Sequence, residues 1–237
     1  MVSRIVTSVL VGAALSAGAV VQAATLDVLS SGYGTPNAGT WAGSGNSVTD
    51  IGGKDSISAG VWNFTNATTP ATGDFRSDVF VFKLPSLNGE QLTGAQFAAW
   101  QWGVQGSVSY NVNAVVLGVR TTPEILASDY NAGTLLDANF ATPGDFGVRS
   151  LSASGQSILL NALQPTYIAN SYLFIGITTA SEVTATGGYP FSTHDRSAQD
   201  ILDRKVPFLT LTAVPEPASL GLLGLSVVGL LGRRRAR

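Results

Sequence analysis

Apolar and polar residues alternate along several short segments of the chain, which is the pattern of strands with one buried face. The clearest case is residues 78–84, where Phe80, Phe82 and Leu84 share one side before Pro85 ends the segment. We expect these three side chains to face the core. Residues 93–102 fit either a helix or a strand, and we favour a strand because it places Trp100 and Trp102 on one face.

Other segments repeat this pattern between glycine-rich turns. Further strands are predicted at residues 26–29, 47–51, 56–62, 108–119, 172–178 and 206–212, with the rest of residues 30–60 forming turns. Residues 123–130 predict one helical turn, and residues 157–163 fit either a short helix or an irregular strand. Many short strands with little helix predict an all-β fold, an antiparallel β-sandwich or jelly roll.

The N-terminal end has a different pattern. Residues 1–4 carry a positive charge, residues 5–21 are apolar, and the small residues Ala23 and Ala24 follow. This order predicts a signal peptide over residues 1–24, removed by signal peptidase so that the mature chain begins at Ala24 or Thr25. A retained transmembrane helix is the alternative, but the polar, turn-rich sequence that follows argues against it.

The C-terminal end, residues 214–237, combines three parts. The first part is a Pro-Glu-Pro triplet with extended backbone, which together with the preceding valine comprises Val214, Pro215, Glu216 and Pro217. The second part, residues 218–232, carries no charge. The third part is a basic cluster that stops the segment on the cytoplasmic side, at Arg233, Arg234, Arg235 and Arg237. As a helix the uncharged part reaches only about 22 Å, against a hydrocarbon core of about 30 Å. It suits a temporary transmembrane helix better than an ordinary tail anchor, which is the alternative.

These three parts, in this order, resemble the PEP-CTERM sorting signal of Gram-negative bacteria. The resemblance implies recognition by a membrane-embedded exosortase, transient association with the inner membrane, cleavage near the triplet, and transfer of the mature protein to the cell surface or the extracellular space.

Composition narrows what the remaining domain, residues 25–213, can do. Without Arg4 and the four tail arginines, thirteen basic residues become eight, and without Glu216 fifteen acidic residues become fourteen, so the charge is near −6. Nucleic acid is excluded as a partner because no basic stripe is present to neutralise phosphates. Cysteine is absent, which excludes disulfides and thiolate metal sites but not export.

The central strands show a second resemblance. The segments are DVFVFKLPSL at residues 78–87, LTGAQF at 92–97, FSTHD at 191–195 and PFLTL at 207–211. Their order resembles the extracellular DNRLRE-type jelly-roll domain, over residues 74–212. The resemblance implies a carbohydrate-binding-like fold in surface proteins and transfers no site.

No set of residues forms a recognisable catalytic motif. His194 is the only histidine, and no Gly-x-Ser-x-Gly elbow accompanies it, so we assign no catalytic residue. One histidine without cysteine cannot supply a typical zinc site, so we assign neither a metal ligand nor a cofactor. Calcium is the alternative, because it accepts scattered Asp and Asn oxygens, but no EF-hand loop is present.

Aromatic residues are the remaining candidates for ligand contact. Trp41 lies in a glycine-rich loop and is the tryptophan most expected to be exposed for stacking on a sugar ring. The other tryptophans and tyrosines are expected in the core. The sequence therefore favours a non-catalytic binding or structural protein associated with exopolysaccharide in a biofilm. A secreted polysaccharide-active hydrolase is the alternative.

Overall fold

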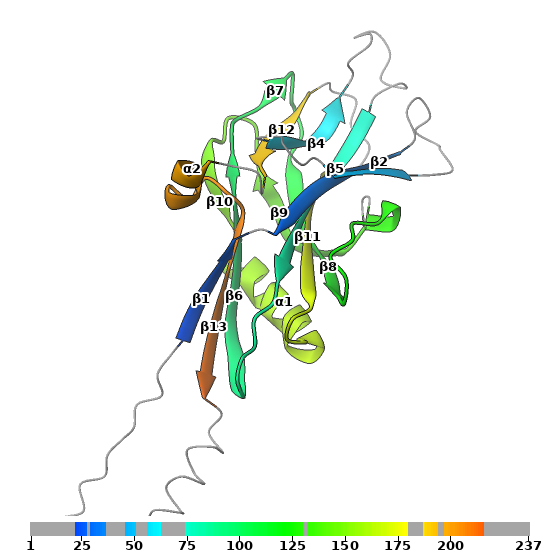
Figure 1. Cartoon of the computed structure of the whole chain (residues 1–237). Coiled ribbons are helices and arrows are strands. Elements are labelled where there is room, and N and C mark those ends of the chain that lie inside the picture. The colour runs from blue at the N-terminus through cyan, green and yellow to red at the C-terminus, as the bar shows by residue number, and fades with distance from the viewer. Residues whose placement is uncertain are drawn as a thin grey trace, which may run out of the picture.

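The structure is a computed structural model, and it describes residues 22–27, 29–36, 46–50, 56–62, 74–129, 132–179, 187–193 and 197–215. Strands dominate these residues, with two short α-helices (Figure 1). The strands are β1 (Gln22–Asp27), β2 (Ser30–Pro36), β3 (Asn46–Asp50), β4 (Ser56–Trp62), β5 (Asp74–Lys83), β6 (Glu90–Gln101), β7 (Gln105–Gly106), β8 (Val112–Arg120), β9 (Thr134–Ala141), β10 (Gly147–Ser150), β11 (Tyr172–Thr179), β12 (Gly187–Ser192) and β13 (Phe208–Pro215). The helices are α1 (Ala153–Leu163) and α2 (Ala198–Leu202), and 3-10 turns occupy Ala127–Asp129 and Gln164–Thr166.

The strands pair antiparallel and form two sheets. The main path runs β1-β13-β6-β12-β4-β5-β11-β8-β9, and the two sheets join where β4 pairs with β5. Strands β10 and β7 extend the first sheet, and β2 and β3 extend the second. This arrangement confirms the prediction of an all-β antiparallel sandwich.

A cluster of phenylalanines holds the two sheets together. The ring of Phe97, from β6, lies 5.8 Å from Phe80 and 5.9 Å from Phe82 of β5, measured between centroids. On another side it stacks on Phe140 of β9 at 5.7 Å. Phe80, Phe82 and Leu84 are fully buried, so the predicted inward face is confirmed.

Helix α1 resolves one ambiguity in the sequence. The side chain of Ser152 caps its N-terminus by accepting a hydrogen bond from the backbone N–H of Gly155. Leu159 and Leu163 are buried, and the helix packs against β6 and β9, one strand from each sheet. The apolar run at residues 158–160 is therefore helical, whereas residues 93–102 form most of β6, as favoured above.

Several strands lack a readable pattern in the sequence. Residues 30–36, expected to be turns, form β2, and strands β7, β9, β10 and β12 have no counterpart in the prediction. Strand β12 reads Gly-Gly-Tyr-Pro-Phe-Ser, yet every one of its residues is buried. These segments become strands because neighbouring strands pair with their backbone and cover their side chains, so their local propensity does not decide the outcome.

We predict that Phe97→Ala lowers the free energy of unfolding by about 3–5 kcal/mol, because it leaves a cavity between the sheets. Urea denaturation followed by tryptophan fluorescence measures the change. Phe146→Ala is the matched control, since Phe146 is 61% exposed and its loss leaves no internal cavity. Similar losses in the two variants would contradict the role assigned to the phenylalanine cluster.

Candidate functional site

The first and last strands of the described chain are direct neighbours. Strands β1 and β13 pair antiparallel, with Gln22 opposite Ala213, Ala23 opposite Thr212 and Ala24 opposite Leu211. In Figure 1 the start of β1 and the end of β13 lie side by side at one end of the molecule. The predicted signal-peptidase site and the residues before the Pro-Glu-Pro triplet therefore lie together.

The end of β13 is held by the sheet. Val214 lies opposite Gln91 and Pro215 lies opposite Glu90, both on β6. The register shifts between Thr212 and Ala213, which marks a β-bulge just before the triplet. Proline has no N–H to continue a ladder, so Pro215 suits the end of a strand. The predicted boundary after residue 213 therefore falls inside β13.

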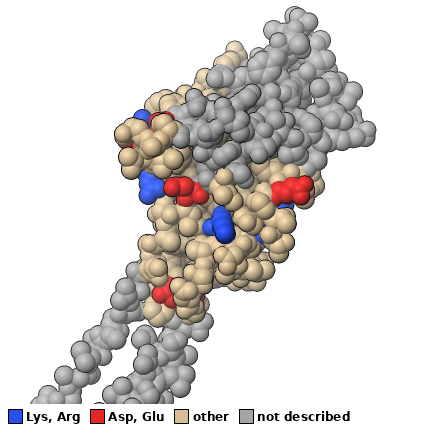
Figure 2. Space-filling model, in the orientation of Figure 1, with Lys and Arg blue, Asp and Glu red and all other residues tan. Residues whose placement is uncertain are grey.

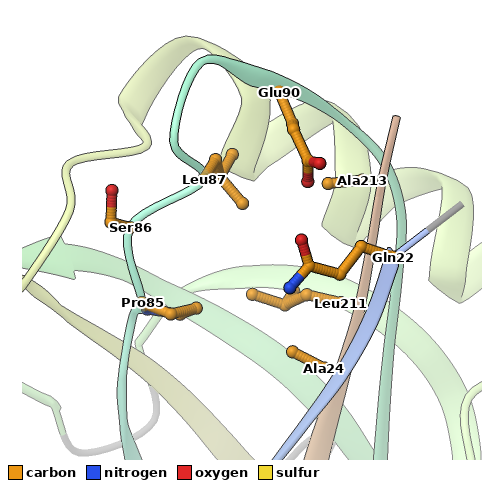
Figure 3. Close-up of a pocket in the computed structure, with 8 residues that line it drawn as sticks. All are labelled: Gln22, Ala24, Pro85, Ser86, Leu87, Glu90, Leu211 and Ala213. Atoms are coloured by element: carbon orange, nitrogen blue, oxygen red, sulfur yellow. The ribbon is translucent and has the colours of Figure 1, made fainter. Parts of the chain in front are cut away.

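A small pocket of about 50 Å³ lies beside these paired ends (Figure 3). Its lining comes from β1, β13, the start of β6 and the connection between β5 and β6, and consists of Gln22, Ala24, Pro85, Ser86, Leu87, Glu90, Leu211 and Ala213. The connection turns at Asn88 and Gly89, which both have positive φ, and the backbone N–H of Glu90 closes this tight turn by donating to the carbonyl of Leu87 at 2.8 Å. In Figure 3 the side chains of Gln22 and Glu90 both reach over the pocket.

Comparison with known families identifies this end of the chain. Residues 213–235 match the family model of the PEP-CTERM protein-sorting motif. The chain carries a PEP-CTERM sorting motif. It is accordingly an exported protein that exosortase recognises and processes, with transient membrane anchoring before processing. No curated protein matches the chain.

The PEP-CTERM motif begins inside the folded domain. Val214 and Pro215 are the last described residues, both half-buried in β13. Glu216, Pro217, the apolar stretch predicted as a helix and the arginine cluster lie outside the described residues. Within the part that is described, no helix is long and apolar enough to cross a membrane.

A cluster of exposed and half-buried aromatic rings forms a second candidate site. Trp100 of β6 contacts Trp102 edge-on, with ring centroids 5.6 Å apart, so the prediction that they share a face is confirmed. The expectation that they lie in the core is wrong, because both are only half-buried. Phe146 also meets Trp100 edge-on at 5.6 Å, and Val148 of β10 lies opposite Trp100 in the ladder. We call Trp100, Trp102, Phe146 and Val148 the aromatic patch. The indole N–H of Trp102 donates to Ser192, whereas that of Trp100 has no hydrogen-bond partner among the described residues.

Charged residues near the aromatic patch form ion pairs. Asp145 forms an ion pair with Arg149 at 2.9 Å and accepts hydrogen bonds from the backbone N–H and the hydroxyl of Thr142, which orders the turn that carries Phe146. Partial burial acts to raise the pKa of Asp145, but these hydrogen bonds and the charge of Arg149 outweigh it, so the pKa lies below its ordinary value. Lys205 lies 5.9 Å from the Trp100 ring centroid and pairs with Asp200 and Asp203.

The other predicted residues divide into buried and undescribed ones. Tyr110 and Tyr189 are buried and contact each other edge-on, in agreement with a core role. Trp41 and His194 lie outside the described residues. Phe146 was not singled out from the sequence, although it stands in a Pro-Gly-Asp-Phe-Gly turn, the same signal that drew attention to Trp41. An aromatic residue in a glycine-rich turn is therefore the signal that could have identified Phe146.

Acidic residues in the described part have structural partners. Asp129 pairs with Arg120 and accepts the backbone N–H of Leu126, and Asp137 accepts the backbone N–H of Ser152 at 2.6 Å. Among the described residues, no group of three or more His, Cys, Asp or Glu side chains could hold a metal ion.

We predict that Glu216→Ala abolishes C-terminal processing, because it removes the charged centre of the sorting triplet, and leaves the domain folded, because β13 ends at Pro215. Intact-mass measurement of membrane and external fractions detects the uncleaved chain. Glu124→Ala, which removes an exposed glutamate far from the triplet in sequence, is the control. Normal C-terminal mass for the Glu216 variant would contradict the assignment.

Proposed function

We propose that the processed domain is a non-catalytic component of the cell surface or of an exopolysaccharide biofilm matrix, and that it binds polysaccharide through the aromatic patch. The observation that carries this proposal is the exposure of Phe146 beside Trp100 on an ordered turn. Export and exosortase processing support the proposal, because exopolysaccharide occurs outside the inner membrane.

The chemistry of the patch suits a sugar chain. Pyranose rings present an apolar C–H face that packs on aromatic rings and a rim of hydroxyls that needs hydrogen-bond partners. Phe146 and Trp100 supply the apolar surface, and Asp145, Arg149 and Lys205 supply polar groups nearby. Because these charges are already paired with opposite ones, they favour hydroxyl groups over a strongly charged ligand.

The surface charge supports the same class of ligand. Figure 2 shows Lys, Arg, Asp and Glu of the described residues scattered singly or in mixed groups on the face in view, with uncharged surface between them. A net charge near −6 for residues 25–213 follows from the sequence. Both properties fit a neutral polysaccharide better than a polyanion. The resemblance to DNRLRE-type domains points the same way.

A polysaccharide hydrolase is the less favoured function. Glycoside hydrolysis uses two carboxyl groups across a cleft. Three pockets in the described part of the chain contain a single carboxylate between them, Glu90. Reducing-sugar release from matrix polysaccharide, abolished by changing one or two aspartates, would establish the hydrolase instead.

We predict that Phe146→Ala and Trp100→Ala each weaken binding roughly tenfold, which corresponds to the loss of one ring contact. Affinity electrophoresis in gels loaded with exopolysaccharide from the producing bacterium measures this as reduced retardation. Leu202→Ala is the matched control, because Leu202 is 76% exposed on α2 and lies outside the aromatic patch. Trp41→Ala tests the residue chosen from sequence. Unchanged retardation in the Phe146 and Trp100 variants would refute this site.

A further inference from the structure

We propose that pairing of β1 with β13 couples the two cleavages of this chain: while the signal peptide is retained, Gln22–Ala24 hold the end of β13 in the sheet and slow the exosortase cut, and early removal of the signal peptide prevents this. The proposal rests on the predicted signal peptide and on processing by exosortase, and is independent of polysaccharide binding. It follows from the pairing of the two cleavage regions with each other.

Strand β1 has one pairing partner among the described strands, and that partner is β13. Because β13 lies near the C-terminus, β1 has no strand to pair with while the rest of the chain is being exported. The bonds after Ala23 and Ala24 stay extended and unpaired during that period, which is the state a peptidase can bind. Once β13 docks, the same backbone is held in the sheet.

The intact β1 strand also holds β13 from its second side. Residues 211–213 lie between Gln22–Ala24 of β1 and their partners on β6, directly before Val214 and Pro215. Pro215 can reach an enzyme active site only if the end of β13 separates from β6. Each backbone pair that holds the preceding residues raises the free energy of that local opening.

Cleavage at either predicted site weakens this hold without removing β1. A cut before Ala24 removes two β1 positions opposite β13, and a cut before Thr25 removes three. The remainder stays in place because Leu26 packs against the core and Asp27 pairs with Arg204 at 3.2 Å. Gln22 is lost from the pocket wall in both cases, and Ala24 in the second, so the pocket opens beside Leu211 and Ala213.

The test combines a blocked N-terminal site with a released C-terminal one. The double variant Ala23→Leu, Ala24→Leu removes the small residues that signal peptidase requires and keeps the strand. Thr25→Leu places the same side chain one position further and is the control. The native chain and the double variant are also each made with an insertion of six residues, alternately Gly and Ser, between Ala213 and Val214. This insertion frees the triplet from β6. The full chain is expressed in its exporting host, and mass spectrometry follows both ends over time.

We expect the blocked chain to lose its C-terminal peptide about tenfold more slowly than the native or Thr25→Leu chain, because its two or three retained β1 positions add to the free energy of opening the end of β13. The insertion should restore the native rate. C-terminal cleavage of the blocked chain at the native rate would overturn the proposal. A slow rate that the insertion does not restore would also overturn it, because anchoring at the N-terminus would then be the cause.

Hydrogen exchange gives a reading that does not depend on the blocking variant. We expect the amides of residues 211–213, which lie opposite Gln22–Ala24, to exchange faster on average in the chain with a mature N-terminus than in the full-length chain extracted in detergent. Equal exchange in the two forms would overturn the proposal, since β1 would then add nothing to the stability of the end of β13.

Discussion

Burial of Phe97 between the two sheets is the contact on which the rest of the structure depends. It brings β6 against β5 and β9, and the three strands come from different parts of the chain. With β6 fixed, β13 has an edge on which to pair, and β1 can add to β13. The aromatic patch depends on the same strand, because Trp100 lies on the opposite face of β6 from the core.

Side chains alternate between the two faces of β6, so this strand contributes both to the core and to the aromatic patch. Phe97 and Ala99 point inward and are fully buried, whereas Trp100 lies half-buried on the outer face with Phe146 beside it. A strand with a rigid inner face keeps its outer face ordered as well, since side chains alternate across one backbone. The order of the turn at Thr142–Asp145 adds to this, so that an exposed ring is presented without local disorder.

Because β1 pairs with β13, both termini of the folded domain lie at the same end of the molecule. The predicted signal peptide and the PEP-CTERM motif continue from adjacent strands at the same end of one sheet, which suits a domain connected to one membrane through both ends before processing. The absence of a spacer between Val214 and the sheet means that the stability of β13 affects access to the motif. Residues 213–215 thus belong both to the sheet and to the sorting motif.

The sequence by itself determined the all-β class, the inward face of Phe80 and Phe82, and the sorting motif. Each of these depends on neighbouring residues: on alternation along one strand or on a short contiguous signal. Helix α1 was left open because Ile158-Leu159-Leu160 suits either structure, and strand β12 was missed because two glycines and a proline hide it. Only the tertiary structure decided that β1 lies beside β13 and that Phe146 lies beside Trp100. Those contacts join residues far apart in the chain, and they form because the sheets bury their apolar faces together rather than because of any local preference.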